Sequence, residues 1–264
     1  MLSREQKPGN LVQTIERVAN IFEVMAQNTQ GISLKELSAR VSLPKGTIHR
    51  LLSSLAYFGY VRQASESKNY QLGFKLVELG NSLLNQLDVR VQARPFLVGL
   101  SKGIKETIHL VVFDQNEALY VDKVESDEKL GGLQMVSRVG TRIPAHCSSV
   151  GKVFLAHLSD SQLDTLIKEK GLTKRTKNTI TDPEKLTQHL KVIRQQGYAV
   201  DDEENEKGIR CVGAPIFNQR GQVIAAISIS GPAVRITQKI IQQTLRKEVL
   251  QTALDISREM GYQN

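Results

Sequence analysis

The residues of this chain that could perform chemistry lie close together, in Ser149-Val150-Gly151-Lys152 and in His146-Cys147. A serine three residues before a lysine is the S-x-x-K pattern of serine acylases, but the sequence lacks the S-D-N and K-T-G partners of that pattern. Gly151-Lys152 also lacks the upstream glycine and the following serine or threonine of a phosphate-binding loop. Neighbouring His146 and Cys147 point apart at a helix start, whereas a Cys–His dyad needs spatial proximity. The sequence therefore argues against an enzyme.

Cysteine usage and hydropathy restrict the class of protein further. Cys147 and Cys211 are the only cysteines, too few for a disulfide framework. Together with His146 and the acidic run 201–206 they have no spacing typical of a zinc site, so we expect no metal and no cofactor. No apolar run approaches the roughly 20 residues that span a bilayer, and the first residues lack the apolar segment of a signal peptide. We therefore expect a cytoplasmic protein with no membrane partner.

A different chemistry, recognition of an anionic polymer, is indicated by a helix predicted to start at Ser42-Leu43-Pro44, where Pro44 suits the first helical turn. Its apolar face repeats at Ile48, Leu51, Leu52 and Leu55, which is helical spacing. The remaining face carries small, hydroxyl-bearing and basic side chains in its N-terminal half, which suit contacts with phosphates and base edges. Ser42 is a candidate helix cap. The predicted DNA contacts are Ser42, Lys45, Gly46, Thr47, His49 and Arg50, joined by Arg62 and Lys68 from a following β-hairpin.

The elements around this helix complete the pattern of a winged helix-turn-helix. Ser33 and Glu36 have the form of a capping box for a preceding helix. A β-hairpin around a polar tip at 63–69 predicts the wing. An earlier helix over about 11–26 repeats apolar residues at Val12, Ile15, Val18, Phe22 and Met25, which we expect to close the small core.

The distribution of charge favours DNA as the partner. Residues 1–75 contain ten lysines and arginines against five acidic residues, so they hold +5 of the total net charge of +8. A basic domain is the electrostatic signature of a phosphate partner. An ordinary helical hairpin on a surface remains the alternative. RNA binding is less well supported, because no aromatic side chains accompany the basic residues as a stacking platform.

The rest of the chain predicts an α+β domain with a mainly antiparallel sheet, because strands and helices are grouped rather than alternating. Expected strands cover 107–113, 117–123, 133–139, 198–200, 211–217 and 222–230. Expected helices cover 148–158, 161–168, 183–196 and 235–260, the last with Ile240, Ile241, Leu245, Val249, Ala253 and Ile256 facing inward. A helix at 74–87 is either a linker that packs against a second subunit or a core helix of this domain.

Several blocks of the sequence, in order along nearly its whole length, resemble the IclR family of bacterial transcriptional regulators. The matching blocks are Leu43-Pro44-Lys45-Gly46-Thr47-Ile48-His49-Arg50, Gly59-Tyr60-Val61, Glu106-Thr107-Ile108-His109, Ser137-Arg138-Val139-Gly140, Gly151-Lys152, Asn178-Thr179-Ile180-Thr181, Gly208-Ile209-Arg210-Cys211 and Ala226-Ile227-Ser228-Ile229-Ser230-Gly231-Pro232. Where Gly46 stands the family usually has serine, so one hydroxyl that could touch phosphate is missing.

The resemblance implies a winged helix-turn-helix at 1–73, a linker helix at 74–92 and a GAF-like effector-binding and oligomerisation domain at 93–264. It implies a homodimer or dimer of dimers on a palindromic double-stranded DNA operator. Such proteins are mostly repressors of catabolic operons, with some activators, and their effectors are small organic, sugar or aromatic acids.

The resemblance also places an effector pocket at Ser149, Val150, Asp201, Ile209, Cys211, Ser228 and Ser230. Physical arguments agree, because Ser149 opens a helix whose N–H groups suit a carboxylate. Ser228 and Ser230 lie two apart on one strand and so share a face. Three alternatives remain open: the two serines bond neighbouring backbone, Asp201 belongs to a solvated acidic loop, and Cys211 is simply a core residue.

Overall fold

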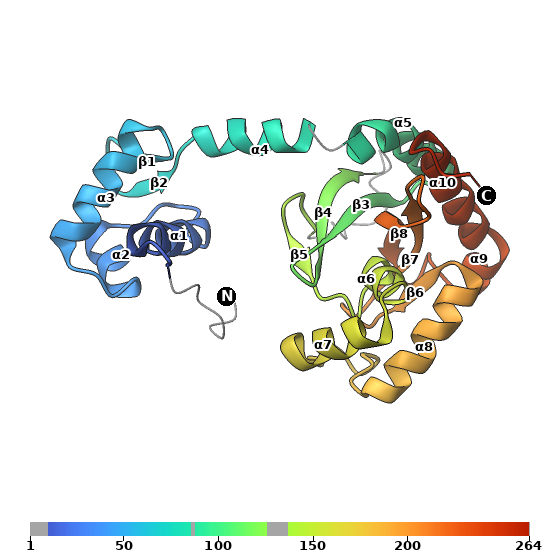
Figure 1. Cartoon of the computed structure of the whole chain (residues 1–264). Helices are drawn as coiled ribbons and strands as arrows, with labels where there is room; N and C mark the ends of the chain where they lie inside the picture. The colour runs from blue at the N-terminus through green and yellow to red at the C-terminus, as the bar shows by residue number, and fades with distance from the viewer. Residues whose placement is uncertain (1–9, 86–87, 126–136, 264) are drawn as a thin grey trace. The chain divides into compact units, whose positions relative to one another are not determined.

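The computed structural model of the protein describes residues 10–85, 88–125 and 137–263, and the chain divides into two compact units, Met1–Gln86 and Leu87–Asn264. The first is helical with a two-stranded sheet. The second is built on a six-stranded antiparallel sheet with helices on both faces (Figure 1). The predicted α+β class, with a winged helix-turn-helix followed by a mainly antiparallel domain, is confirmed.

The first unit is organised around one small hydrophobic core. Its elements are α1 (Gln13–Ala26), α2 (Leu34–Arg40), α3 (Lys45–Tyr57), β1 (Val61–Gln63), β2 (Tyr70–Leu72) and α4 (Lys75–Asn85). Strands β1 and β2 pair antiparallel, with Val61 opposite Leu72, and form the predicted wing. The buried core residues are Ile21, Met25, Ile32, Leu37, Ile48, Leu52, Leu55, Val61 and Tyr70. Burying these side chains holds α3 against α1 and α2 and leaves its other face in solvent.

Two predicted helix caps behave differently from one another. The Ser33 hydroxyl accepts a hydrogen bond from the Glu36 N–H at 3.2 Å, as predicted, but the Glu36 carboxylate accepts from Arg40 at 2.7 Å instead of reaching back. The prediction that Ser42 caps α3 is wrong. Ser42 has φ +53°, a left-handed turn conformation, and Pro44 is the residue that precedes the first helical turn.

Helix α1 packs into the core over only part of its length. Ile21 and Met25 are buried, and Val18 and Phe22 pack beside them. Val12 and Ile15 were predicted to join the core, but they are 61% and 63% exposed. The core begins only at Val18, so the first turn of α1 extends beyond the side chains that could cover it.

The second unit has the strand order β5-β4-β3-β8-β7-β6, with every neighbouring pair antiparallel. The strands are β3 (Thr107–Asp114), β4 (Glu117–Val124), β5 (Arg142–Ile143), β6 (Ala199–Asp202), β7 (Ile209–Phe217) and β8 (Val223–Pro232). Residues 133–136 of the strand predicted at 133–139 lie outside the described residues. Residues 137–139 are described and do not form a strand.

Helices cover both faces of this sheet. Helix α5 (Asp88–Ile104) packs against β3 and β4, and α10 (Arg246–Glu259) packs against β7, β8 and α5. Helix α6 (Ser149–Leu155) packs against the central strands and against α8 (Pro183–Gln196), and α7 (Asp160–Lys170) follows α6 in the chain. The cluster of buried side chains around α6 and α8 includes Val153, Phe154, Leu186 and Leu190. This arrangement holds the N-terminus of α6 directly over the sheet.

The C-terminal helix contains a π-helical segment, Ile241–Leu245, between α9 (Gln238–Ile240) and α10. Ile241, Leu245, Val249, Ala253 and Ile256 are buried, as predicted, but Ile240 is 40% exposed and its predicted burial is wrong. A π turn holds an extra residue, so the inward face of the helix does not continue through both Ile240 and Ile241.

The described residues contain no helix long and apolar enough to cross a bilayer. The predicted domain limits at 73 and 92 stay predictions. Helix α4 ends at Asn85 and α5 begins at Asp88, and residues 86–87 between them lie outside the described residues.

Candidate functional site

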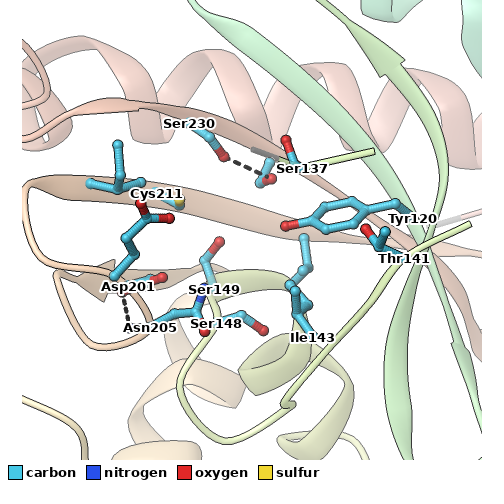
Figure 2. A pocket seen from close by; sticks show the side chains of 14 residues that line it. Tyr120, Ser137, Thr141, Ile143, Ser148, Ser149, Asp201, Asn205, Cys211 and Ser230 are labelled. Carbon is cyan, nitrogen blue, oxygen red and sulfur yellow. Dashed lines mark hydrogen bonds between the residues drawn. The ribbon is translucent and has the colours of Figure 1, made fainter. Parts of the chain in front are cut away.

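A cavity of about 230 Å³ lies between the sheet of the second unit and the N-terminus of α6 (Figure 2). Its wall includes all seven residues predicted for the effector pocket: Ser149, Val150, Asp201, Ile209, Cys211, Ser228 and Ser230. Seven further residues, which sequence reasoning did not place there, complete it: Tyr120, Ser137, Thr141, Ile143, Ser148, Asn205 and Glu206.

Strand register explains how residues from three strands meet in the floor of this cavity. Asp201 on β6 lies opposite Cys211 on β7, and Cys211 lies opposite Ser230 on β8. Because residues directly opposite in a sheet share a face, the three side chains form one row across the sheet. Ser228, two residues before Ser230, belongs to the same face of β8.

Close packing of α6 needs two glycines. A Cβ atom on Gly213, which lies opposite Ser228, would sit 3.1 Å from both the Ile227 carbonyl and the Ser149 hydroxyl. A Cβ on Gly151 would sit 2.3 Å from the Ala145 Cα. Glycine at position 213 therefore lets the start of α6 approach the sheet, and glycine at position 151 lets the helix pack against the segment that leads into it.

The first turn of α6 presents polar groups to the cavity. The Ser148 hydroxyl caps the helix by accepting from the Gly151 N–H at 3.2 Å, and it donates to the Pro144 carbonyl at 3.0 Å. The N–H groups of Ser149 and Val150 have no partner within the helix, as in any first turn. In Figure 2 the Ser149 hydroxyl points toward the centre of the cavity, as does the hydroxyl of Tyr120 across from it.

The serines of β8 belong to a buried hydroxyl network. The Ser230 hydroxyl lies 3.3 Å from that of Ser228 and 3.3 Å from Nδ1 of His109, and Nε2 of His109 lies 2.7 Å from the Ser137 hydroxyl. The His109 ring packs on Tyr120, with centroids 4.7 Å apart. Burial, with a smaller contribution from the charge of Lys123, lowers the pKa of His109 to about 3. His109 is therefore a neutral linker that positions Ser230 from behind the cavity wall.

Asp201 is buried rather than part of a solvated loop. Its side chain is 3% exposed, and Oδ1 accepts from the Glu204 N–H at 2.7 Å and more weakly from the Asn205 N–H. Burial raises the pKa of Asp201 to about 7, although the charge of Lys152 and the backbone donors act in the opposite direction. Glu204 is buried as well, and Glu206 is the one exposed residue of the run 201–206, so the alternative of a solvated acidic loop is wrong.

Lys152 holds this acidic loop beside α6. It is fully buried, and its ammonium group donates to the Glu204 carboxylate and to the Val200 carbonyl at 2.6 Å, with Nε2 of His189 at 3.4 Å. The lysine of the S-x-x-K pattern therefore anchors the loop by an ion pair with Glu204. The other pair considered for chemistry, His146 and Cys147, makes separate contacts. Burial raises the pKa of the Cys147 thiol to about 12. Nε2 of His146 lies 3.0 Å from the Thr173 carbonyl oxygen.

The cavity offers hydrogen bonds without a positive side chain. Its described wall contains hydroxyls, one thiol, one amide and the carboxyl groups of Asp201 and Glu206, but no lysine or arginine. Burial also raises the pKa of the Cys211 thiol well above its usual value, so Cys211 stays a neutral wall residue. Such a wall can hold a small polar molecule by hydroxyl and backbone contacts and by the N-terminus of α6.

The predicted DNA contacts form a very different surface. Ser42, Lys45, Gly46, His49 and Arg50 are exposed on one side of the α2–α3 turn and α3, and Thr47 is half-buried. No described acidic side chain forms an ion pair with Lys45 or Arg50. On the wing, the Arg62 guanidinium lies over the Phe74 ring at 5.0 Å, and Lys68 lies at the tip in a left-handed turn with φ +57°.

Four of the seven additional cavity residues escaped prediction for the same reason. Tyr120 lies on β4 and Ser137, Thr141 and Ile143 lie before α6, far in sequence from the β7–β8 hairpin that they face. Ser148 carries the one local signal, since a serine before a helix start is a capping pattern.

The sequence matches known proteins over almost its full length. Residues 14–65 match the IclR helix-turn-helix domain, and residues 81–258 match the family described as bacterial transcriptional regulator IclR C-terminal. The chain is 35% identical over 252 residues to the HTH-type transcriptional regulator XynR of Escherichia coli K12, covering 96% of this chain and 98% of that protein. It is 36% identical over 228 residues to the transcriptional repressor IclR of the same organism, covering 86% and 82%.

Two solved structures have the same fold. The Thermotoga maritima IclR structure gives a TM-score of 0.78 at 34% identity, with 94% of this chain and 99% of that one covered. An IclR homologue from Microbacterium hydrocarbonoxydans, complexed with 4-hydroxybenzoate, gives 0.79 at 25% identity, with 93% and 99% covered. The protein therefore belongs to the IclR family of bacterial transcriptional regulators, non-enzymatic proteins that join a DNA-binding helix-turn-helix domain to an effector-binding domain.

Proposed function

We propose that this protein is a cytoplasmic repressor of a catabolic operon, and that a small organic or sugar acid in the cavity changes its affinity for a palindromic operator. One observation carries the proposal: the seven residues expected to hold an effector line a single cavity, whose wall combines hydroxyl and carboxyl groups with a few apolar side chains. The relative named as a transcriptional repressor supports the repressor role. The homologue complexed with 4-hydroxybenzoate supports a small organic acid as the effector.

In this proposal, the acid lies with its carboxylate toward the N–H groups of Ser149 and Val150 and with its hydroxyl or keto groups toward the Ser228–Ser230 side. The absence of lysine and arginine from the described wall supports this orientation, because backbone donors and hydroxyls are then the main groups available to a carboxylate. A ligand of this kind suits a cavity of about 230 Å³, which is too small for a cofactor.

DNA is bound by a dimer or a dimer of dimers. Helix α4 exposes Val77, Leu79 and Leu83. Val12, just before α1, and Ile15 within it are exposed as well, and a second subunit would cover these apolar surfaces. Two recognition helices then read half-sites about one DNA turn, roughly 34 Å, apart. Arg50 and Lys45 contact phosphates or base edges, with Thr47 and His49 beside them. The effector acts through its different affinity for two arrangements of the dimer, typically about 1–3 kcal/mol.

The test combines operator selection with effector titration. Duplexes selected from a random pool by the full chain should contain an inverted repeat, and gel-shift titrations with 4-hydroxybenzoate and a panel of two- to six-carbon hydroxy and keto acids should find one that weakens binding. Ser230→Ala should lose the response to that acid and retain ligand-free DNA binding, whereas Ser161→Ala, an exposed serine on α7, should behave as wild type. Loss of both DNA binding and response in Ser230→Ala would contradict an effector role for Ser230.

A further inference from the structure

The second unit has another hollow, larger than the effector cavity and open to solvent. This groove has a volume of about 640 Å³ and lies along α8, the far end of β7, the π-helical segment and α10. Strand β7 contributes Ile209 and Cys211 to the effector cavity and Pro215 and Phe217 to the groove. Apart from β7, no strand or helix lines both the groove and the effector cavity, so the groove is a separate site.

The groove contains a row of aromatic rings. The Phe217 ring stacks on Tyr262, with centroids 5.1 Å apart and planes at 27°. The His157 ring meets Phe217 edge-on at 5.6 Å. Leu250 and Leu254 of α10 line the same groove. Partly exposed aromatic and leucine side chains in a concave surface are the usual lining of a small-molecule site.

Positive side chains surround this apolar lining. Arg194 comes from the last turn of α8, and Arg246 and Lys247 come from the start of α10, while no aspartate or glutamate lines the groove among the described residues. Arg194 and Lys247 form no ion pair within the described part of the chain. The charge of Arg194 also contributes, after burial, to lowering the pKa of His157, which puts the guanidinium near the aromatic row.

The π-helical segment is an independent sign that this surface has been shaped for binding. Ile241–Leu245 places Gln242 and Gln243 at the groove, and Arg246 follows with its guanidinium held by the Gln242 side chain at 3.0 Å. Short π-helical segments inside α-helices are rare and are frequently found at functional sites. Here the segment directs amide and cationic side chains of the same helix to one hollow.

We propose that the groove binds an amphipathic organic anion, a carboxylic acid with an acyl or aromatic body. The hydrocarbon part lies on the Phe217–Tyr262 stack and on Leu250, and the carboxylate pairs with Arg194 and Arg246. The arginine fork suits a carboxylate. This site is chemically the reverse of the effector cavity, which is rich in hydroxyls and has no cation in its described wall, and it does not depend on the effector proposal.

The absence of tryptophan from the chain makes a direct test possible. Tyr262→Trp keeps an aromatic ring on Phe217 and gives the full-length protein a single tryptophan at the groove. Tyr120→Trp gives a matched emitter in the wall of the effector cavity. Sodium octanoate is the probe, titrated at 0.15 M salt, where long-range charge effects are screened. We expect a saturable change in the Tyr262→Trp emission and none in the Tyr120→Trp emission.

Charge variants then decide whether the groove itself holds the anion. Arg194→Gln with Arg246→Gln should weaken octanoate binding at least tenfold, both by Tyr262→Trp emission and by calorimetry on protein without the tryptophan. Lys191→Gln with Lys239→Gln, exposed cations on α8 and α9 outside the groove, should change it less than twofold. The proposal would be overturned if the arginine variants bound octanoate as tightly as wild type, or if the lysine variants lost as much affinity as the arginine variants. A response to octanoate in Tyr120→Trp but not in Tyr262→Trp would overturn it too. A Tyr262→Trp emission that follows protein concentration instead of octanoate would also overturn it, since a second copy would then cover the groove.

Discussion

The recognition helix and the effector cavity use polar side chains in opposite ways. On α3, the proposed DNA contacts Lys45, His49 and Arg50 are exposed to solvent. In the cavity, Asp201, Ser228 and Ser230 are each no more than 3% exposed, so their polar atoms must find partners inside the protein or on a ligand. Changes on the first surface should therefore alter binding alone, whereas changes in the second should alter folding as well.

The difference is greatest behind the cavity, where a complete charge pair is buried. Lys152 and Glu204 have side chains 0% and 7% exposed, and the second carboxylate oxygen of Glu204 has no hydrogen-bond partner. Two charges in this position stabilise one another, but each alone would be costly. The pair fixes the loop that carries Asp201 and Asn205 against α6.

Removing one member of this pair should give the largest effect. Lys152→Met leaves the Glu204 charge buried without its partner, and we expect the free energy of unfolding of the second unit to fall by about 3–5 kcal/mol. Urea denaturation followed by circular dichroism measures the loss.

The matched control combines Lys152→Met with Glu204→Gln, which removes both charges and should recover most of the stability. If the double variant were as unstable as the single one, lost packing around Lys152 rather than an unpaired buried charge would explain the loss. The contrast between buried and exposed charges would then not apply to Lys152 and Glu204.

A smaller effect should appear in the pH dependence of stability. Burial raises the pKa of Asp201 from 3.8 to about 7 in the folded protein, so between these values the folded state holds a proton that the unfolded chain releases. The contribution of Asp201 to the free energy of unfolding is therefore fully present below pH 3.8. It is lost as pH rises toward 7, with a slope of up to about 1.4 kcal/mol per pH unit.

Asp201→Asn keeps an oxygen for the Glu204 N–H and does not titrate. Urea unfolding at about pH 3.5, 5, 6, 7 and 8 should show the variant matching wild type only at the lowest pH, then exceeding it in stability by a margin that grows up to about pH 7 and stays constant above it. Parallel curves for the two proteins across this range would mean that Asp201 is ionised throughout, contrary to its burial.

On the recognition surface the expected change is in binding alone. Arg50→Ala should weaken operator binding by at least about 1 kcal/mol, a roughly fivefold rise in Kd, because an exposed cation on α3 is lost from the DNA contact. Its unfolding midpoint should match that of wild type. Lys102→Ala, an exposed cation of the second unit, is the control for net charge. An Arg50→Ala gel shift equal to that of wild type would place the DNA contact elsewhere.

The same contrast explains what the sequence could predict. Local patterns sufficed for α3, since one turn of helix fixes which side chains face the core and which face solvent: Ile48 and Leu52 are buried and Arg50 is exposed. They failed where the backbone departs from the regular period, as at Ser42 in a left-handed turn and at Ile240 before the π turn.

The effector cavity required more than local patterns. Ser228 and Ser230 share a face by strand period, but their meeting with Asp201 depends on the register of three strands, which came through the family resemblance. No local pattern pointed to Tyr120 or Ser137 as cavity residues, because they reach the cavity only through the packing of β4 and the segment before α6. The burial of Lys152 was equally hidden, since its partner Glu204 lies 52 residues away in a run that looks solvated.

The smallest expected effect tests how finely the recognition surface is adjusted. Gly46 lies in the first turn of α3, and a Cβ atom there would meet nothing within 4 Å. Gly46→Ser should therefore stabilise the first unit by about 0.5 kcal/mol through helix propensity and add a hydroxyl within reach of a phosphate. Gly46→Ala is the matched control, with at least as large a gain in helix stability and no hydroxyl. If serine tightens operator binding and alanine does not, the hydroxyl contacts DNA. Equal affinities in the two variants would show that residue 46 acts only through the stability of α3, and that this position of the recognition surface contributes no direct contact.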